Sequence, residues 1–139
     1  MIIFGRKKIS AHLILKIDTQ GAEYQVFQGM AGVIASRYVA CVMEFTPHAL
    51  VTSIDALQFL TQLGQRFLIV DVGQQNLKNR KTGSGAICQL LNTSDYDGFV
   101  ANVRERPYGW TDLLLVPKKL PALNDLLSQL GIENTAGVL

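Results

Sequence analysis

The sequence is poor in charge and in cysteine, and it lacks any long hydrophobic run. Charged residues make up only 17% of the 139 residues, against roughly 25% in average soluble proteins. No apolar run approaches the roughly 20 residues of a membrane-spanning helix, and the two cysteines match no metal-binding spacing. At the start, apolar residues precede basic ones, the reverse of a secretory signal. We therefore expect a soluble, reduced, cytoplasmic protein with no metal and no membrane segment.

Charges of the two signs nearly balance, because 13 Lys and Arg face 11 Asp and Glu, a net charge of +2. Basic residues gather in 1–16 and again in 78–81, but aromatic residues do not alternate with them as they do on nucleic-acid surfaces. We interpret both clusters as solvated surface. Binding of a nucleotide or RNA through the second cluster is a third alternative, behind the two functions given below.

Alternating apolar runs and helical patterns predict an α/β fold. Strands are expected over 13–17, 37–45, 67–72 and 110–117, and helices over 22–36, 54–64, 95–103 and 120–130. The run 13–17 is nearly unbroken and rich in branched residues, which favours a buried strand in a largely parallel sheet. The second and third helices are expected to be capped by Thr52 or Ser53 and by Thr93 or Ser94. Residues 73–85 are predicted to be a loop.

Polar residues follow the first two predicted strands, where ligands bind in open α/β sheets. These residues are Asp18, Thr19 and Gln20 after the first strand, and Glu44, Thr46 and His48 after the second. Asp71 joins them if the third strand runs in the same direction. Carboxylates at one edge can orient a cation, hold a hydroxyl or act as a general base. The structural alternative is that Asp18 caps a helix, Glu44 has a partner in the fold and His48 has no chemical role.

Motifs of other enzyme classes are absent from the sequence. The segment TGSG at 82–85 lacks the spacing of a phosphate-binding loop, and no GxGxxG, HExxH, GxSxG or CxxC occurs. The usual dinucleotide fingerprint is therefore missing, and metalloprotease, serine-hydrolase and dithiol redox chemistry have no support.

Three segments resemble the FkbM-type family of S-adenosylmethionine-dependent methyltransferases. They are LKIDTQGAEYQVFQGM (15–30), VMEFTP (42–47) and YGWTDLLLVPK (108–118). The similarity extends from about residue 13 to 119. It implies a Rossmann-like methyltransferase fold of seven strands with an antiparallel last strand, in which 13–17 corresponds to the fourth strand. The fold class expected here is thus a partial sheet of this kind, mostly parallel with a final antiparallel strand.

The same resemblance implies an enzyme that transfers a methyl group from S-adenosylmethionine to a hydroxyl oxygen of a small molecule or sugar. It places Asp18 at the reaction centre near the methyl donor or acceptor, and Glu23 and Glu44 match further acids of the family. We expect Asp18, Thr19 and Gln20 to bind the cofactor, Asp18 to position the acceptor hydroxyl or the charged end of the donor, and Glu44 or His48 to assist catalysis by removing the proton.

The glycine-rich loop and the second acid that hold the cofactor in such folds have no counterpart in this sequence, which resembles the C-terminal half of the enzyme. We expect a basic lead (1–12), a methyltransferase-like domain (13–119), and a C-terminal helix and tail (120–139). Alone, the chain should form an incomplete site. The first strand should have an open edge, covered by a second copy (a homo-oligomer), by residues 1–4, or by a complementing chain. The alternative function is a non-catalytic protein-interaction module derived from this fold.

Overall fold

The computed structural model describes residues 12–73, 88–129 and 131–132. Most of the expected basic lead, the loop over 74–85 and the tail from 133 lie outside these residues. The described chain forms a sheet of five strands in the order β1-β2-β5-β3-β4. The strands are β1 (His12–Ile17), β2 (Tyr38–Phe45), β3 (Phe67–Asp71), β4 (Gln89–Leu90) and β5 (Thr111–Pro117).

Strand direction decides which residues meet at each end of the sheet. β1 and β2 are parallel, whereas β5 is antiparallel to both β2 and β3. β1, β2 and β3 therefore run the same way, and the prediction of an antiparallel final strand is confirmed. The sheet is mixed rather than mostly parallel, because β5 lies between β2 and β3 and β4 adds a further antiparallel pair.

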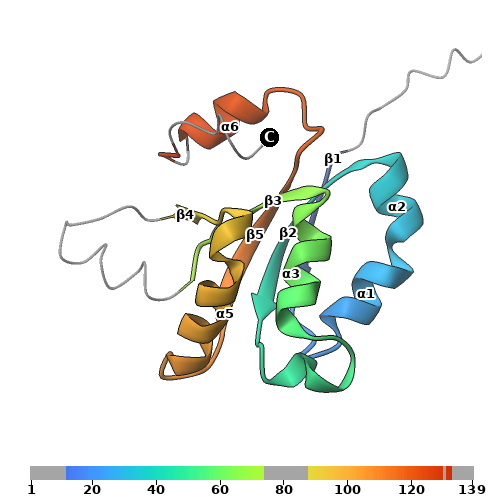
Figure 1. Cartoon of the computed structure of the whole chain (residues 1–139). Helices are drawn as coiled ribbons and strands as arrows, with labels where there is room; N and C mark the ends of the chain where they lie inside the picture. The colour runs from blue at the N-terminus through green and yellow to red at the C-terminus, as the bar shows by residue number, and fades with distance from the viewer. Residues whose placement is uncertain (1–11, 74–87, 130, 133–139) are drawn as a thin grey trace, which may run out of the picture.

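Helices cover one face of the sheet fully and the other face only in part (Figure 1). The covering helices are α1 (Glu23–Gly29), α2 (Ala31–Ser36), α3 (Ala56–Gly64) and α5 (Tyr96–Glu105). They enclose the main core, which includes Met43, Phe45, Phe59 and Leu113. On the other face α6 (Leu123–Gln129) packs on β3 and β5 through a smaller apolar cluster. None of the described helices is long and apolar enough to cross a membrane.

The helices differ in detail from the expected ones. The predicted helix over 22–36 is two short helices that meet at Met30; a glycine lies close on either side, and each weakens a helix by about 1 kcal/mol relative to alanine. The prediction that Thr52 or Ser53 caps the next helix is wrong, because α3 begins later and the Asp55 carboxylate accepts from Leu57 N at 3.0 Å and Gln58 N at 3.1 Å.

The cap expected from Thr93 or Ser94 is not formed either. Both residues belong to a short 3-10 turn, Thr93–Asp95, which leads directly into α5, and the helix start shows no side-chain cap bond. The last helix is shorter than the expected 120–130, since α6 covers Leu123–Gln129.

β1 is not the buried strand that its composition predicts. Of its six residues only Ile17 is buried, and the side chain of Ile14 at its centre is 82% exposed. The reason is topological: within the described residues β1 pairs with β2 alone, and α6 covers the far end of the open face. A strand that is apolar on its core side, and that carries Ile14 between two polar residues on its other face, therefore stands at the edge of the sheet.

Candidate functional site

The carboxyl ends of three strands and the beginning of β5 meet at one edge of the sheet. Ile17 pairs with Met43, so Asp18 follows β1 beside the end of β2, and Glu44 pairs directly with Asp112 of β5. We call Asp18, Glu44 and Asp112 the carboxylate cluster. Its position agrees with the prediction that the residues after the first two strands share an edge.

Glu23 fixes the loop that carries Asp18, Thr19 and Gln20. Its side chain is 1% exposed and accepts from Thr19 N at 3.2 Å, from the Thr19 hydroxyl at 3.1 Å and from Gly21 N at 2.9 Å. Gln20 and Gly21 both have positive φ, 49° and 106°, and glycine adopts such angles at no steric cost. The sharp turn leaves Asp18 and Gln20 exposed, whereas both donors of Thr19 point to Glu23.

The turn after β2 packs against this loop. A Cβ atom on Gly21 would lie 2.7 Å from the carbonyl oxygen of Ala49, so only glycine allows the two segments to approach this closely. The neighbouring His48 is exposed, and its Cδ2 lies 3.5 Å from where a Cβ would stand on Gly109, just before β5. His48 therefore borders the same edge as the carboxylate cluster.

Glu44 is half-buried and has a local partner, because the Thr46 hydroxyl donates to its Oε1 at 3.1 Å. Asp18 is more open: its carboxylate is 45% exposed and lies 3.7 Å from Lys16 Nζ. Exposed ion pairs of this kind contribute only about 0–1 kcal/mol to stability. The Asp18 carboxylate is thus accessible to a ligand at little cost to the fold.

Asp112 is the member of the cluster that sequence reasoning missed. Burial raises the pKa of its carboxyl, the charges of Asp18 and Asp71 raise it further, and Lys16 opposes them. The segment containing Asp112 resembles the last strand of the family, but its aspartate becomes part of the site only because β5 runs antiparallel and begins at this edge. That placement requires the tertiary fold.

The raised pKa of Asp112 predicts that this carboxyl lowers the stability of the folded chain as the pH rises. Below the ordinary value of 3.8 the carboxyl is neutral in the folded and the unfolded chain alike; as the pH rises, the folded chain ionises less readily and stability is lost. Asp112→Asn should therefore raise the melting temperature at neutral pH and have no such effect below pH 3.8. The exposed Asp97 on α5 serves as control, since Asp97→Asn should show no such pH-dependent gain. A loss of stability in Asp112→Asn at neutral pH would contradict this interpretation.

Asp71 lies at the same edge, because β3 runs in the same direction as β1 and β2. Its carboxylate, however, stabilises the fold. It is 3% exposed, lies 2.9 Å from Arg106 Nη2, and accepts from the Thr111 hydroxyl at 2.6 Å. These contacts join β3, β5 and the end of α5. We assign Asp71 to the support beneath the site and not to the accessible cluster.

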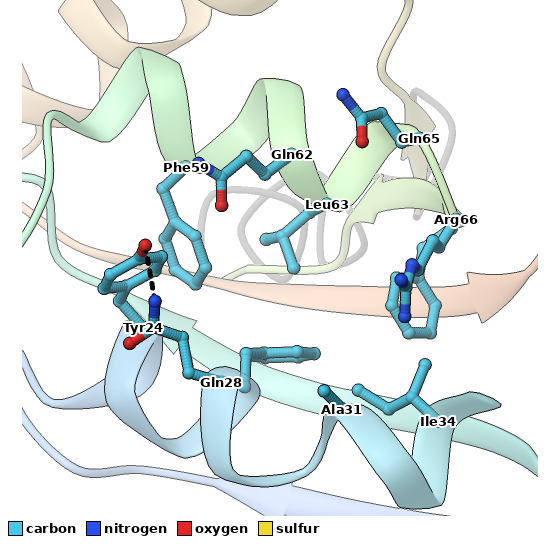
Figure 2. A pocket seen from close by; sticks show the side chains of 11 residues that line it. Tyr24, Gln28, Ala31, Ile34, Phe59, Gln62, Leu63, Gln65 and Arg66 are labelled. Atoms are coloured by element: carbon cyan, nitrogen blue, oxygen red, sulfur yellow. Dashed lines mark hydrogen bonds between the residues drawn. The ribbon is translucent and has the colours of Figure 1, made fainter. Parts of the chain in front are cut away.

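A cavity of about 440 Å³ lies elsewhere, between α1–α2 and α3 (Figure 2). Aromatic rings line it, among them Tyr24 and Phe59, and Gln28 Nε2 donates to Tyr24 Oη at 2.7 Å. Arg66 stands at one end, just before the amino end of β3. The cavity is therefore on the helical face, away from the carboxyl ends of the strands. No group of three or more metal-ligating side chains is found in the part of the chain that the structure describes.

The described chain is a mixed α/β protein with a five-stranded sheet, which is consistent with a methyltransferase-like fold. Residues 3–67 match the family model of the methyltransferase FkbM domain. This match confirms the resemblance to the FkbM-type methyltransferases over these residues, and the resemblance expected as far as residue 119 stays a prediction. The matched segment includes all the predicted site residues, namely Asp18, Thr19, Gln20, Glu44 and His48, but ends before Asp71 and Asp112. No curated protein and no solved structure matches the chain significantly.

Proposed function

We propose that this chain forms the acceptor side of a methyltransferase site that transfers a methyl group from S-adenosylmethionine to a hydroxyl oxygen of a small molecule or sugar. The observation that carries the proposal is the family match over β1 and β2, which includes the loop with Asp18 and the acid Glu44. The methyl donor carries a positive charge, and the accessible Asp18 within a cluster of three carboxylates offers the complementary sign.

Each of the edge residues has a role that its position allows. Asp18 and Gln20 are exposed on the turn held by Glu23 and would contact the donor, whereas Thr19 uses its donors to hold the turn. His48 and Glu44 border the edge from β2 and would take the proton of the acceptor hydroxyl. Asp112 supplies a further negative charge opposite Glu44.

When bound, S-adenosylmethionine supplies a methyl group on a positively charged sulfur, which leaves with the electron pair of the broken carbon–sulfur bond. The protein residues have to align the acceptor oxygen with that methyl group, because alignment provides most of the rate gain in such a displacement. As the oxygen–carbon bond forms, the hydroxyl proton passes to His48 or Glu44. This chain offers residues for the acceptor and for the charge of the donor, and we propose that it holds the donor only weakly alone.

Calorimetric titration with S-adenosylmethionine tests the proposal. The full chain should bind the donor weakly, with a dissociation constant in the millimolar range, and Asp18→Ala should weaken that binding by roughly tenfold or more, the equivalent of one charge-assisted contact. Asp97→Ala, which removes an exposed carboxylate on α5, should leave the affinity unchanged. Equal affinity of the Asp18 and Asp97 variants would contradict the assignment of Asp18.

A non-catalytic interaction module is the second candidate. The observation that favours it is the exposed edge of β1, whose central side chain Ile14 is 82% exposed. Such an edge is a template for pairing with another chain. Absence of any donor binding at millimolar concentration, together with association through β1, would support this function over methyl transfer.

A further inference from the structure

The outer edge of β1 has features that natural edge strands usually avoid. All six residues pair in regular register with β2, from His12↔Tyr38 to Ile17↔Met43, without a bulge. Edge strands are commonly protected by proline, by bulges or by charged side chains. β1 contains no proline, and its single lysine, Lys16, forms an ion pair with Asp18. The outer backbone groups of this strand are thus suited to pairing.

The side chains of β1 are also incompletely buried. Ile14 points away from the main core and is 82% exposed, the highest value among the large hydrophobic side chains that the structure describes as exposed. On the core side Leu13 and Leu15 are only half-buried, although both pack against the main core. His12 is held by stacking on Tyr38 of β2, with ring centroids 5.4 Å apart. The strand therefore presents Leu13 and Leu15 on its core side and one apolar side chain, Ile14, between His12 and Lys16 on its other face.

We propose that a second copy of this chain covers the edge, pairing antiparallel through β1 about a two-fold axis that passes beside Ile14. In this register Ile14 faces Ile14 of the other copy, Leu13 faces Leu15, and His12 faces Lys16. Opposed residues of antiparallel strands lie on the same face with Cβ atoms about 4.5–5.5 Å apart. Core-side residues consequently meet core-side residues, and the two sheets join into one with both helical layers on the same face.

The sequence of β1 is self-complementary in this register. Apolar residues meet apolar residues on both faces, and the only lysine is opposite a histidine rather than another lysine. Shifting the register by one residue would place Ile14 opposite Leu15 and so bring an outward side chain against a core-side one. A two-fold, isologous interface of this kind closes after two copies and does not propagate into a fibre.

The proposal is independent of the methyltransferase function. Because the strands are antiparallel, the Asp18 loops of the two copies lie at opposite ends of the paired strands, so neither copy completes the site of the other. The dimer should form equally with and without S-adenosylmethionine. A failure to bind the donor would therefore leave this proposal intact, and a monomeric chain would leave the proposed function intact.

Sedimentation equilibrium with charge-swapped variants at position 14 tests both the partner and the register. The full chain should have twice its chain mass of 15.3 kDa. Ile14→Lys and Ile14→Glu should each sediment as monomers, because like charges would then be directly opposed across the axis. An equimolar mixture of the two variants should recover the dimer mass. Tyr108→Lys, which changes an equally accessible side chain (72% exposed) beyond α5, should remain dimeric.

Three results would overturn the proposal. The full chain could sediment at 15.3 kDa, which would assign the edge to another occupant. Ile14→Lys could remain dimeric, which would place the interface elsewhere on the molecule. Finally, the mixed variants could remain monomeric although each is folded by circular dichroism, which would exclude the register centred on Ile14.

Discussion

Asp71→Ala is expected to destabilise the protein by about 3–5 kcal/mol, the cost of leaving a buried partner charge uncompensated. The carboxylate of Asp71 is 3% exposed and the Arg106 side chain 12%, so little water can replace the lost contact at 2.9 Å. The Thr111 hydroxyl and Gly73 N would lose their acceptor as well. Urea unfolding at neutral pH measures the change directly.

A double variant separates the cost of an unpaired charge from the value of the pair. Asp71→Leu combined with Arg106→Leu should be clearly more stable than Asp71→Leu alone, because no buried charge is then left unpartnered. The exposed pair Lys16–Asp18 is the matched control, and Asp18→Ala should cost no more than about 1 kcal/mol. Similar losses in Asp71→Ala and Asp18→Ala would contradict the distinction between a supporting and an accessible carboxylate.

Glu23→Ala is the second change with a large expected effect. The buried carboxylate accepts three donors from the turn after β1, and alanine would leave Thr19 N and Gly21 N without an acceptor. Thr19 is exposed and Gly21 is half-buried, so water can replace part of these contacts, and we expect a loss of about 1–3 kcal/mol. The turn should also relax, since Gln20 adopts a positive φ of 49° that a non-glycine residue takes up only when it is held in place.

Two measurements check the role of Glu23. Urea unfolding gives the loss of stability, and amide hydrogen exchange at Gly21 reports opening of the turn. Glu23→Gln keeps the shape of the side chain and one oxygen acceptor, so it should lose less stability than Glu23→Ala. It should still weaken the binding of S-adenosylmethionine. Unchanged exchange at Gly21 in Glu23→Ala would show that Glu23 does not hold the loop.

The long strands could be predicted closely from the sequence, whereas the two-residue strand β4 was not expected and the exposure of the strands could not be predicted. Runs of branched apolar residues placed the strand ending at Ile17 and the one ending at Phe45 to within one residue, because continuous apolar runs are typical of central strands. The same composition predicted burial for β1, which depends on what lies beside the strand. Exposure of Ile14 is a property of the sheet order and is not encoded in the local pattern.

The helices and caps show how local signals compete. Glycines beside Met30 weakened the predicted first helix, and the structure divides it there. Asp55 and the pair Thr52–Ser53 are all good capping residues, and only the backbone path after the turn Ala49–Thr52 selects Asp55. Such choices between neighbouring caps are decided by tertiary packing.

The candidate site was predictable where it depends on strand ends and not where it depends on strand order. Asp18 and His48 follow two consecutive strands that were expected to be neighbours, Glu44 lies at the end of the second, and the structure places all three at one edge. Asp112 joins them only because β5 enters the sheet antiparallel between β2 and β3. Glu23 resembled a family residue, but its hydrogen bonds to the turn could be seen only in three dimensions.

Our central proposal is that the edge bearing the carboxylate cluster is a methyltransferase site. Amide chemical shifts recorded during titration of the full chain with S-adenosylmethionine test it most directly, because they locate even millimolar binding. We predict changes concentrated in residues 18–21, 44–49 and 109–112, and their loss in Asp18→Ala. An absence of shift changes, or changes confined to the helical cavity near Gln62 and Arg66, would contradict the claim.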